Sequence, residues 1–448
     1  MKRAALALLL LAACWDDPQK SSWGFDAIKT MKTPADPMPM CVAGWPVGGP
    51  SNGELDAKRS SCTFGTGATA EASLGIDGAM RGALPIRHVI IAMRENRSFD
   101  HLLHSLHDVS PAVDTVPADY ANPDLKGDLV KPVHADTTCL SPDPGHQSHS
   151  MKVGFDDGKM DGWVKNAAQT TPTDGHYVMG YYEPADLPFD YWLASTWALN
   201  QRHFAPVVSG TYANRNFMLF GDNAGAVDTG IVFPSPATPS ILQTLIANGF
   251  TWGVYADKIP LSGTLDWSTS DPGVKPVQAL YDDLDHGTLP NVVFIDGLDS
   301  VDDDHPTADL HKGEAAVKRL YDHVIDSPQW PLIAMIWVYD EGGGFPDHVK
   351  PNQGCKSISG SPFTQRGPRV PFAVISPWAR KGFVSNVEQD HTAITRFVET
   401  VFGLPALTAR DANSPALLDL FDFSCPGPAS FDAPAAPDAG TGMCANPP

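Results

Sequence analysis

Residues 88–100 read HVIIAMRENRSFD, an unbroken apolar run that ends in a cluster of polar side chains. Residues 332–344 repeat this pattern as LIAMIWVYDEGGG. Both runs are rich in β-branched or aromatic side chains, which predicts strands at His88–Met93 and Leu332–Tyr339. Because neither run alternates with polar residues, both faces of each strand should be buried, as in the parallel sheets of α/β proteins.

Other segments extend the pattern to an α/β fold. The clearest helix is expected at Lys312–Ser327, where Ala316, Leu320 and Val324 recur every fourth residue. Further elements are predicted as strands at Thr251–Tyr255, Val292–Ile295 and Val370–Ile375 and as helices at Ser240–Asn248 and Ala393–Phe402. Strands interleaved with helices predict a central, mainly parallel sheet flanked by helices, with its ligand site beyond the carboxyl ends of the strands.

The composition limits the classes of function. The chain has 448 residues and 42% hydrophobic content, enough to bury a large core. Its 52 acidic and 31 basic residues give a formal charge of -21, and no dense Lys/Arg run interrupts this excess. Such a charge repels a phosphodiester backbone, so nucleic-acid binding is not expected. The sequence makes no prediction of oligomeric state.

The first residues predict export. Met1-Lys2-Arg3 is followed by an apolar run from Ala4 to Ala13, which is typical of a secretory signal and too short for a permanent membrane span. The ending Leu11-Ala12-Ala13-Cys14 resembles a bacterial lipobox, so residues 1–14 are interpreted as a signal peptide whose cysteine becomes lipidated. A peripheral membrane tether through Cys14 and a periplasmic or cell-surface location follow. An ordinary cleaved signal is the alternative.

Domain boundaries are expected where apolar periodicity stops. Residues 15–83 are rich in Gly, Pro and Ser and are interpreted as a linker or loosely ordered leader. The catalytic domain is expected at residues 84–424, followed by a Pro/Ala-rich tail at 425–448. Six cysteines remain after Cys14, which suits up to three disulfides in an oxidising compartment, without selecting one of the 15 pairings.

Oxygen-bearing side chains follow two of the predicted strands. Glu95 and Asn96 come after the first strand, and Asp340 and Glu341 come after the strand that ends at Tyr339. Three carboxylates and an amide form a ligand set suited to one divalent cation, with Ca²⁺, Mg²⁺, Mn²⁺ and Zn²⁺ all left open. Taken alone, each cluster could equally be a solvated loop.

A hydroxyl-bearing segment lies at residues 208–215, which read VSGTYANR. If a helix begins here, the Thr211 hydroxyl lies near backbone N–H groups and Arg215, which together would stabilise an anionic phosphoryl group. Ser and Thr are also ordinary helix caps, and this alternative stays open. A lipase-type Ser-His-Asp site is not favoured, because the sequence has no Gly-x-Ser-x-Gly elbow.

Several ordered motifs resemble a known family. Residues 95–101, ENRSFDH, resemble a signature of the bacterial phosphoesterase family, which includes phosphatidylcholine-type phospholipases C and an acid phosphatase. Further similar segments follow in the family's order, at Gly158–Gly162, Thr211–Arg215, Asp303–Pro306, Asp340-Glu341 and Asp347–Val349. The resemblance covers residues 84–424 and implies an alkaline-phosphatase-like α/β sandwich.

The resemblance also implies roles for single residues. It makes Glu95, Asn96, Asp340 and Glu341 the ligands of the metal, and Thr211 the nucleophile that forms a phospho-threonine. His146 and His305 would contact phosphoryl oxygens or protonate the leaving group, as histidine can near neutral pH. The expected substrate is a phosphate ester such as a phospholipid, cleaved by phospholipase C-type or acid phosphatase-type hydrolysis.

Departures from the family pattern leave alternatives open. Ser209-Gly210 stands where the family has Gly-Pro, so Ser209 is a rival nucleophile. His348 lies in the Asp347–Val349 segment and His391 in a further similar segment, Asp390-His391-Thr392, and each is as readily a structural residue as a site residue. A related sulfatase is an alternative enzyme, although the usual Cys/Ser-x-Pro-x-Arg motif of sulfatases is absent from this sequence. A non-catalytic surface lipoprotein that uses the same fold for binding is the alternative outside the enzymes.

Overall fold

The computed structural model of the chain describes residues 41–42, 44–228, 232, 234, 238–257, 273–296, 304–358, 361–427 and 431–437. The expected signal segment with Cys14 lies outside the described residues, and so does Asp303. No helix in the described ranges combines the length and apolar character needed to cross a bilayer.

A mixed sheet forms the centre of the fold. In the described part of the chain it has eight strands in the order β13-β6-β12-β11-β1-β10-β8-β9. Neighbouring strands run parallel except beside β12, which is antiparallel to both β11 and β6. The strands are β1 (His88–Arg94), β6 (Ala198–Asn200), β8 (Trp252–Tyr255), β9 (Val274–Lys275), β10 (Val292–Asp296), β11 (Ile333–Tyr339), β12 (Phe372–Ile375) and β13 (Val384–Ser385). The predicted mainly parallel sheet and its five predicted strands are confirmed.

The register of the central strands determines where the polar clusters emerge. Arg94 at the end of β1 pairs with Tyr339 at the end of β11, and Met93 pairs with Asp296 at the end of β10. The three strands therefore end level with one another. Glu95, Asp296 and Asp340 consequently reach the same edge of the sheet, as the rule for parallel strands predicts.

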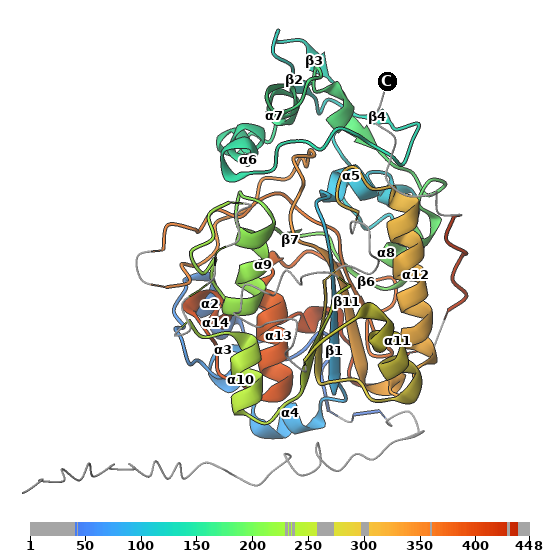
Figure 1. The fold of residues 1–448 in the computed structure, drawn as a ribbon. Helices are drawn as coiled ribbons and strands as arrows, with labels where there is room; N and C mark the ends of the chain where they lie inside the picture. Colours follow the sequence, from blue (N-terminus) through green and yellow to red (C-terminus); the bar gives the residue numbers. More distant parts are fainter. Residues whose placement is uncertain are drawn as a thin grey trace, which may run out of the picture. The chain divides into compact units, whose positions relative to one another are not determined.

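Helices cover both faces of the sheet (Figure 1). One face carries α8 (Pro188–Thr196), α11 (Val277–His286) and α12 (Leu310–Asp326), and the other carries α9 (Thr211–Phe220), α10 (Ile241–Ala247) and α13 (Thr392–Phe402). Ala316, Leu320 and Val324, the apolar residues predicted to line one face of α12, are buried. The Asp309 side chain caps this helix by accepting a hydrogen bond from His311 N. The three predicted helices are all present within one or two residues of their expected ends.

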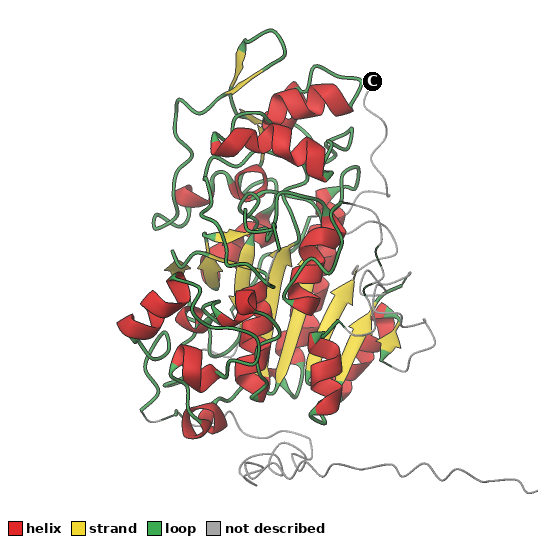
Figure 2. Ribbon diagram, turned by 90° about the vertical axis from the view of Figure 1, so that its left-hand side faces the viewer, coloured by secondary structure: helices red, strands yellow, loops and turns green. Residues whose placement is uncertain are grey.

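A separate layer, here called the capping layer (residues 120–181), lies beyond the carboxyl ends of the strands (Figures 1 and 2). It contains α6 (Ser148–Phe155), α7 (Trp163–Thr170), β2 (Asn122–Pro123), β3 (Leu129–Val130), β4 (Val133–His134) and β5 (Gly180–Tyr181). Its small core includes Met151, Trp163 and Met179 and also takes in Val208 and Phe345 from the loops beside the sheet. The capping layer is thereby packed directly onto the segments that follow the strands.

The leader contains short helices where a linker or loosely ordered chain was expected. These are α2 (Gly53–Ser60), α3 (Ala70–Leu74) and α4 (Gly78–Ala83). Asn52, Thr69 and Asp77 cap their amino ends with side-chain oxygens. The buried Arg396 of α13 donates hydrogen bonds to the carbonyl oxygens of Ala68 and Thr69, which attaches this segment to the main fold.

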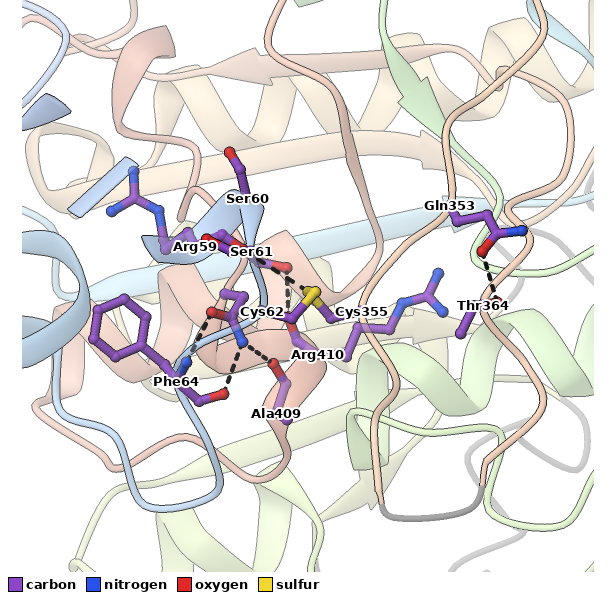
Figure 3. The surroundings of a disulfide bond; sticks show 12 residues. Arg59, Ser60, Ser61, Cys62, Phe64, Gln353, Cys355, Thr364, Ala409 and Arg410 are labelled. Atoms are coloured by element: carbon purple, nitrogen blue, oxygen red, sulfur yellow. Dashed lines mark hydrogen bonds between the residues drawn. A yellow bond between two sulfur atoms is a disulfide. The ribbon is translucent and has the colours of Figure 1, made fainter. Parts of the chain in front are cut away.

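Within the described ranges, two disulfides also attach outlying segments to the main fold. Cys62 bonds Cys355, and Cys41 bonds Cys425 across 384 residues of sequence. Figure 3 shows the first of these beside the end of α2. Nearby, the Asn413 side chain accepts a hydrogen bond from Phe64 N and donates one to Phe64 O. Disulfides fit an oxidising compartment outside the cytoplasm. Further short elements are α5 (Phe99–Leu103), α14 (Ala409–Ala412), β7 (His203–Phe204) and β14 (Gln389–Asp390).

Candidate active site

The two polar clusters predicted at the strand exits meet in the structure. Asp340 Oδ1 accepts hydrogen bonds from Asn96 N at 3.2 Å and from Glu341 N at 2.7 Å. Asn96 has a φ of 63°, and Gly343 packs so closely against it that a Cβ on Gly343 would lie 2.1 Å from Asn96 O. Gly343 itself has a φ of 63°, a conformation that glycine adopts without strain. The segments after β1 and β11 therefore interlock.

Arg215 lies among three carboxylates at this edge. Its Nε lies 3.0 Å from Asp340 Oδ2, and its two Nη atoms each lie 3.2 Å from a carboxylate oxygen, of Glu95 and of Asp296. Asp296 was not predicted as a site residue, although it follows from the same rule because it ends β10. Arg215 thereby joins the ends of β1, β10 and β11 through their carboxylates.

Thr211 is the first residue of α9 and is buried beside Asn96. Its hydroxyl donates a hydrogen bond to Asn96 Oδ1 at 3.4 Å. The hydroxyl of Ser209, the rival nucleophile, instead donates to the carbonyl oxygen of Val227 at 3.0 Å. Of the two hydroxyls, Thr211 is the one bonded to a predicted metal ligand.

A pair of buried histidines supports the backbone of Asp340. His391 Nε2 lies 2.8 Å from Asp340 O, and His391 Nδ1 lies 3.0 Å from His203 Nε2. Since a carbonyl oxygen only accepts, His391 carries its proton on Nε2 and accepts from His203 at Nδ1. Burial lowers the pKa of His391 to about 4 and that of His203 well below its usual range, so both rings are neutral. His391 is thus a supporting residue of the site.

His146 and His305 approach each other from two different segments. Their ring centroids are 5.3 Å apart, and Asp143 Oδ1 lies 3.4 Å from His146 Nδ1. Burial disfavours a charged His146, but the hydrogen bond to Asp143 and the charge of Glu341 outweigh burial and raise the pKa of His146 to about 10. His146 is therefore an imidazolium at neutral pH and can donate a proton. Asp143 was not predicted, although its Asp-x-x-His spacing to His146 was a readable signal.

His348 has a structural environment. Its Nδ1 lies 2.6 Å from Asp100 Oδ2, and Asp100 also accepts a hydrogen bond from the fully buried Arg369. Arg369 bonds Asp347 as well. This network joins α5 to the segment after β11. Asp347 and His348 therefore have structural partners of their own, apart from the Thr211 cluster.

The residues at the strand exits suit a hard cation. Glu341 Oε1 and Asn96 Nδ2 are buried without a hydrogen-bond partner among the described residues. Burial raises the pKa of Glu341 well above its usual range, against the charge of His146, and the charge of Asp340 adds to the rise. A cation beside Glu341 would stabilise its ionised form and occupy the unpartnered oxygen. The set of Glu95, Asn96, Asp340 and Glu341 therefore fits a metal ion by its chemistry, and it stays a prediction.

Comparison with solved structures gives weak likenesses. A protein of the alkaline phosphatase superfamily from Vibrio parahaemolyticus matches with a TM-score of 0.33 and 12% identity, over 69% of this chain and 77% of that chain. A likeness at this level carries no conclusion about the site.

Comparison with known sequences is more specific. Non-specific phospholipase C1 of Arabidopsis thaliana is 30% identical over 373 residues, which cover 73% of this chain and 69% of that protein. Phospholipase C B of Mycobacterium tuberculosis is 28% identical over 463 residues, covering 85% of this chain and 87% of that protein. The sequence model of the phosphoesterase family matches residues 86–405, which include every residue of the site described above. This chain therefore belongs to the phosphoesterase family and is a hydrolase of phosphoric esters.

Proposed function

We propose that the chain cleaves phosphoric esters, of the phospholipase C or acid phosphatase type, through Thr211 as the nucleophile. Glu95, Asn96, Asp340 and Glu341 would hold one divalent cation beside it. The observation that carries this proposal is the hydrogen bond between the Thr211 hydroxyl and Asn96 Oδ1, at the edge of the sheet where the acidic ligands emerge.

Attack on phosphorus would begin at the Thr211 hydroxyl. When bound, the cation would lower the pKa of that hydroxyl and offset charge on the phosphoryl group. As the bond from Thr211 Oγ1 to phosphorus forms, the bond from phosphorus to the leaving oxygen breaks. Backbone N–H groups at the start of α9 and the guanidinium of Arg215 suit the negative charge of the phosphoryl oxygens.

The leaving oxygen needs a proton unless the leaving group is acidic. His146 can supply it, because its raised pKa keeps the ring charged at neutral pH. His305, with its ring beside His146, would contact the phosphoryl group or share this work. Water would then attack phosphorus in the phospho-threonine, which releases the phosphate product and returns the Thr211 hydroxyl.

A phospholipid is the proposed substrate class. The relatives named above are phospholipases C, and the capping layer that carries His146 packs onto the loops beside the sheet. Lipidation at Cys14 would keep the enzyme at a membrane surface, as expected from the first residues. The net charge of -21 provides no attraction to anionic lipid, so a zwitterionic head group suits the protein better.

Kinetics of two matched variants test the nucleophile. With an aryl phosphate and a choline phosphodiester as substrates, Thr211→Ala is expected to lower kcat by at least about 1,000-fold, as loss of a nucleophile does. Ser209→Ala should stay within a few-fold of the unchanged protein, because its hydroxyl bonds Val227 O outside the cluster. Retained turnover in Thr211→Ala together with lost turnover in Ser209→Ala would assign the nucleophile to Ser209.

A further inference from the structure

The β2–β3 hairpin of the capping layer and the segment after it, residues 124–133, expose a group of apolar side chains and are here called the hairpin tip. Leu125 in the turn, Leu129 in β3 and Val133 in β4 are 61%, 71% and 58% exposed. These are the three most exposed large apolar side chains among the described residues, and all lie in residues 125–133. Single exposed leucines are ordinary, whereas a group of exposed apolar side chains indicates an interaction surface.

Buried polar side chains hold the hairpin in shape. Asp124 is buried, and its Oδ1 accepts hydrogen bonds from Lys126 N at 2.8 Å and from Asp128 N at 2.9 Å. The buried Asn122 side chain accepts a hydrogen bond from Trp163 N at 2.9 Å, which attaches the hairpin to α7. The exposed leucines therefore stand on a fixed support.

Strand alternation separates the exposed leucine of β3 from the core. Val130 is partly buried and packs against the core of the capping layer, while its neighbour Leu129 faces solvent. Where one face of a two-stranded sheet is solvated, its outward positions are normally polar. At 71% exposure Leu129 buries little apolar surface within this chain, so its side chain is better explained by a partner than by folding.

Two exposed lysines accompany the apolar side chains. Residues 125–133 contain Lys126, Lys131 and one acid, Asp128, so this segment has a charge of +1 in a chain whose net charge is -21. Lysine beside apolar side chains suits a phospholipid surface. There the apolar groups enter the boundary with the acyl chains, and the ammonium groups meet the phosphate oxygens of the head groups.

The size and the place of the hairpin tip favour a lipid surface over a protein partner. A stable interface between proteins buries about 800 Å² on each partner, which three side chains on a narrow hairpin do not supply. Binding to a lipid interface instead scales with the apolar area that enters it. The hairpin projects from the end of the capping layer that is turned away from the sheet, so it can meet a flat surface first (Figures 1 and 2).

We propose that the hairpin tip docks the protein on a phospholipid surface, with Leu125, Leu129 and Val133 inserted between the head groups. This rests on the proposed function, because a phospholipid substrate places the enzyme at such a surface. A lipid on Cys14 would hold the chain near a membrane without orienting it. The hairpin tip orients it, since it turns the layer that carries His146 towards the lipid.

A fluorophore in the turn tests the proposal. Asp128→Cys in the full chain is labelled with a polarity-sensitive fluorophore and mixed with phosphatidylcholine vesicles. Cys14→Ser in every chain removes the predicted lipid attachment, and a parallel series with Thr211→Ala keeps the vesicles intact. The emission is expected to rise several-fold and to shift to the blue. The same fluorophore on Ile246→Cys, at an exposed position of α10, should not respond.

Substitution of the leucines tests which side chains insert. In the chain labelled at Asp128→Cys, Leu125→Gln with Leu129→Gln should raise the lipid concentration at half of the emission change by at least about tenfold, the usual gain from burying one leucine. Ile246→Gln removes an exposed apolar side chain elsewhere and should leave that concentration unchanged. Circular dichroism checks that both variants fold.

The outcomes separate docking from catalysis. A labelled turn that does not respond to vesicles overturns the proposal, and so does an equal response of the double leucine variant and Ile246→Gln. An emission change that follows protein concentration without vesicles also overturns it, in favour of a second copy of the chain. Insertion without phospholipid hydrolysis by the unchanged protein would contradict the proposed function alone, whereas hydrolysis without insertion would contradict docking alone.

Discussion

Arg94 and Asp304 form a fully buried ion pair that connects the end of β1 to the loop carrying His305. Arg94 Nη2 lies 2.8 Å and Nε lies 2.9 Å from Asp304 Oδ2, and the Tyr339 hydroxyl donates to the same oxygen at 2.7 Å. Arg97 Nε donates to the carbonyl oxygen of Asp304 at 2.9 Å. The backbone next to His305 is thus attached to the same strand that precedes Glu95 and Asn96.

Removing the carboxylate of this pair should destabilise the protein and displace His305. Asp304→Asn removes the negative charge opposite the buried Arg94, and such a change costs about 3–5 kcal/mol in the free energy of unfolding. Asp322→Asn, which breaks a partly exposed ion pair with Lys318 on α12, should cost less than about 1 kcal/mol. Denaturant unfolding measures both variants, and equal stability of the two would contradict the role given to Asp304.

The pH dependence of stability should carry a contribution from Glu314. Burial is the main cause that raises the pKa of Glu314 to about 7, although its carboxylate accepts hydrogen bonds from Phe189 N and Asp190 N. The folded state therefore holds a proton that the unfolded state loses above a pH of about 4.5. Stability from this group is present below that pH and is lost as the pH rises towards 7.

Glu314→Gln should remove this loss, because the amide oxygen can still accept both backbone hydrogen bonds. The difference in unfolding free energy between Glu314→Gln and the unchanged protein should shift in favour of the variant when the pH is raised from 4.5 to 8. The shift should be at most about 3 kcal/mol, since one pKa unit corresponds to about 1.4 kcal/mol. Glu71→Gln, at an exposed position in α3, should show no such gain. Parallel pH dependences of Glu314→Gln and the unchanged protein would refute the assignment.

The disulfide between Cys62 and Cys355 should stabilise the segment from α2 to α4. It joins positions 293 residues apart, and its loss through Cys62→Ser with Cys355→Ser should cost about 2–4 kcal/mol. Limited proteolysis should then cleave first within residues 53–83, because few hydrogen bonds other than those of Arg396 and Asn413 attach this segment. An unchanged cleavage pattern would show that the disulfide is not what attaches it.

Arg215 should be sensitive even to replacement by lysine. Its guanidinium donates to three carboxylates at once, which an ammonium cannot reproduce in the same geometry. Arg215→Lys should lower kcat/KM by about 100-fold, the usual effect of removing one donor from a charged transition state. Arg202→Lys changes a partly exposed ion pair with Asp114 and should keep kcat/KM within a few-fold. Similar values for the two variants would exclude a direct role for Arg215.

The sequence predicted the sheet because its central strands are long, apolar and followed by polar residues. For the same reason Glu95, Asn96, Asp340 and Glu341 could be expected at one edge, whereas the place of Thr211 beside them was implied only by the family resemblance. Asp296, which ends β10, was predictable by this rule but was not named.

Other features depend on packing that local patterns do not encode. Asp143 and His305 lie close together in space, and the capping layer that carries Asp143 packs through Trp163 against Phe345 of the loop after β11. The short helices of the leader carry caps but little apolar periodicity, and their stability comes from Arg396 and a disulfide between distant cysteines. Neither contact could be deduced from sequence spacing.

Isolation of the covalent intermediate tests the central claim most directly. The enzyme is mixed with a phosphate ester, quenched in acid during turnover, digested and analysed by mass spectrometry. We predict a phosphate group on Thr211 in the peptide that contains residues 209–215, and no phosphopeptide from Thr211→Ala. A phosphate on Ser209, or a turning-over enzyme that never carries phosphate on this peptide, would contradict the account.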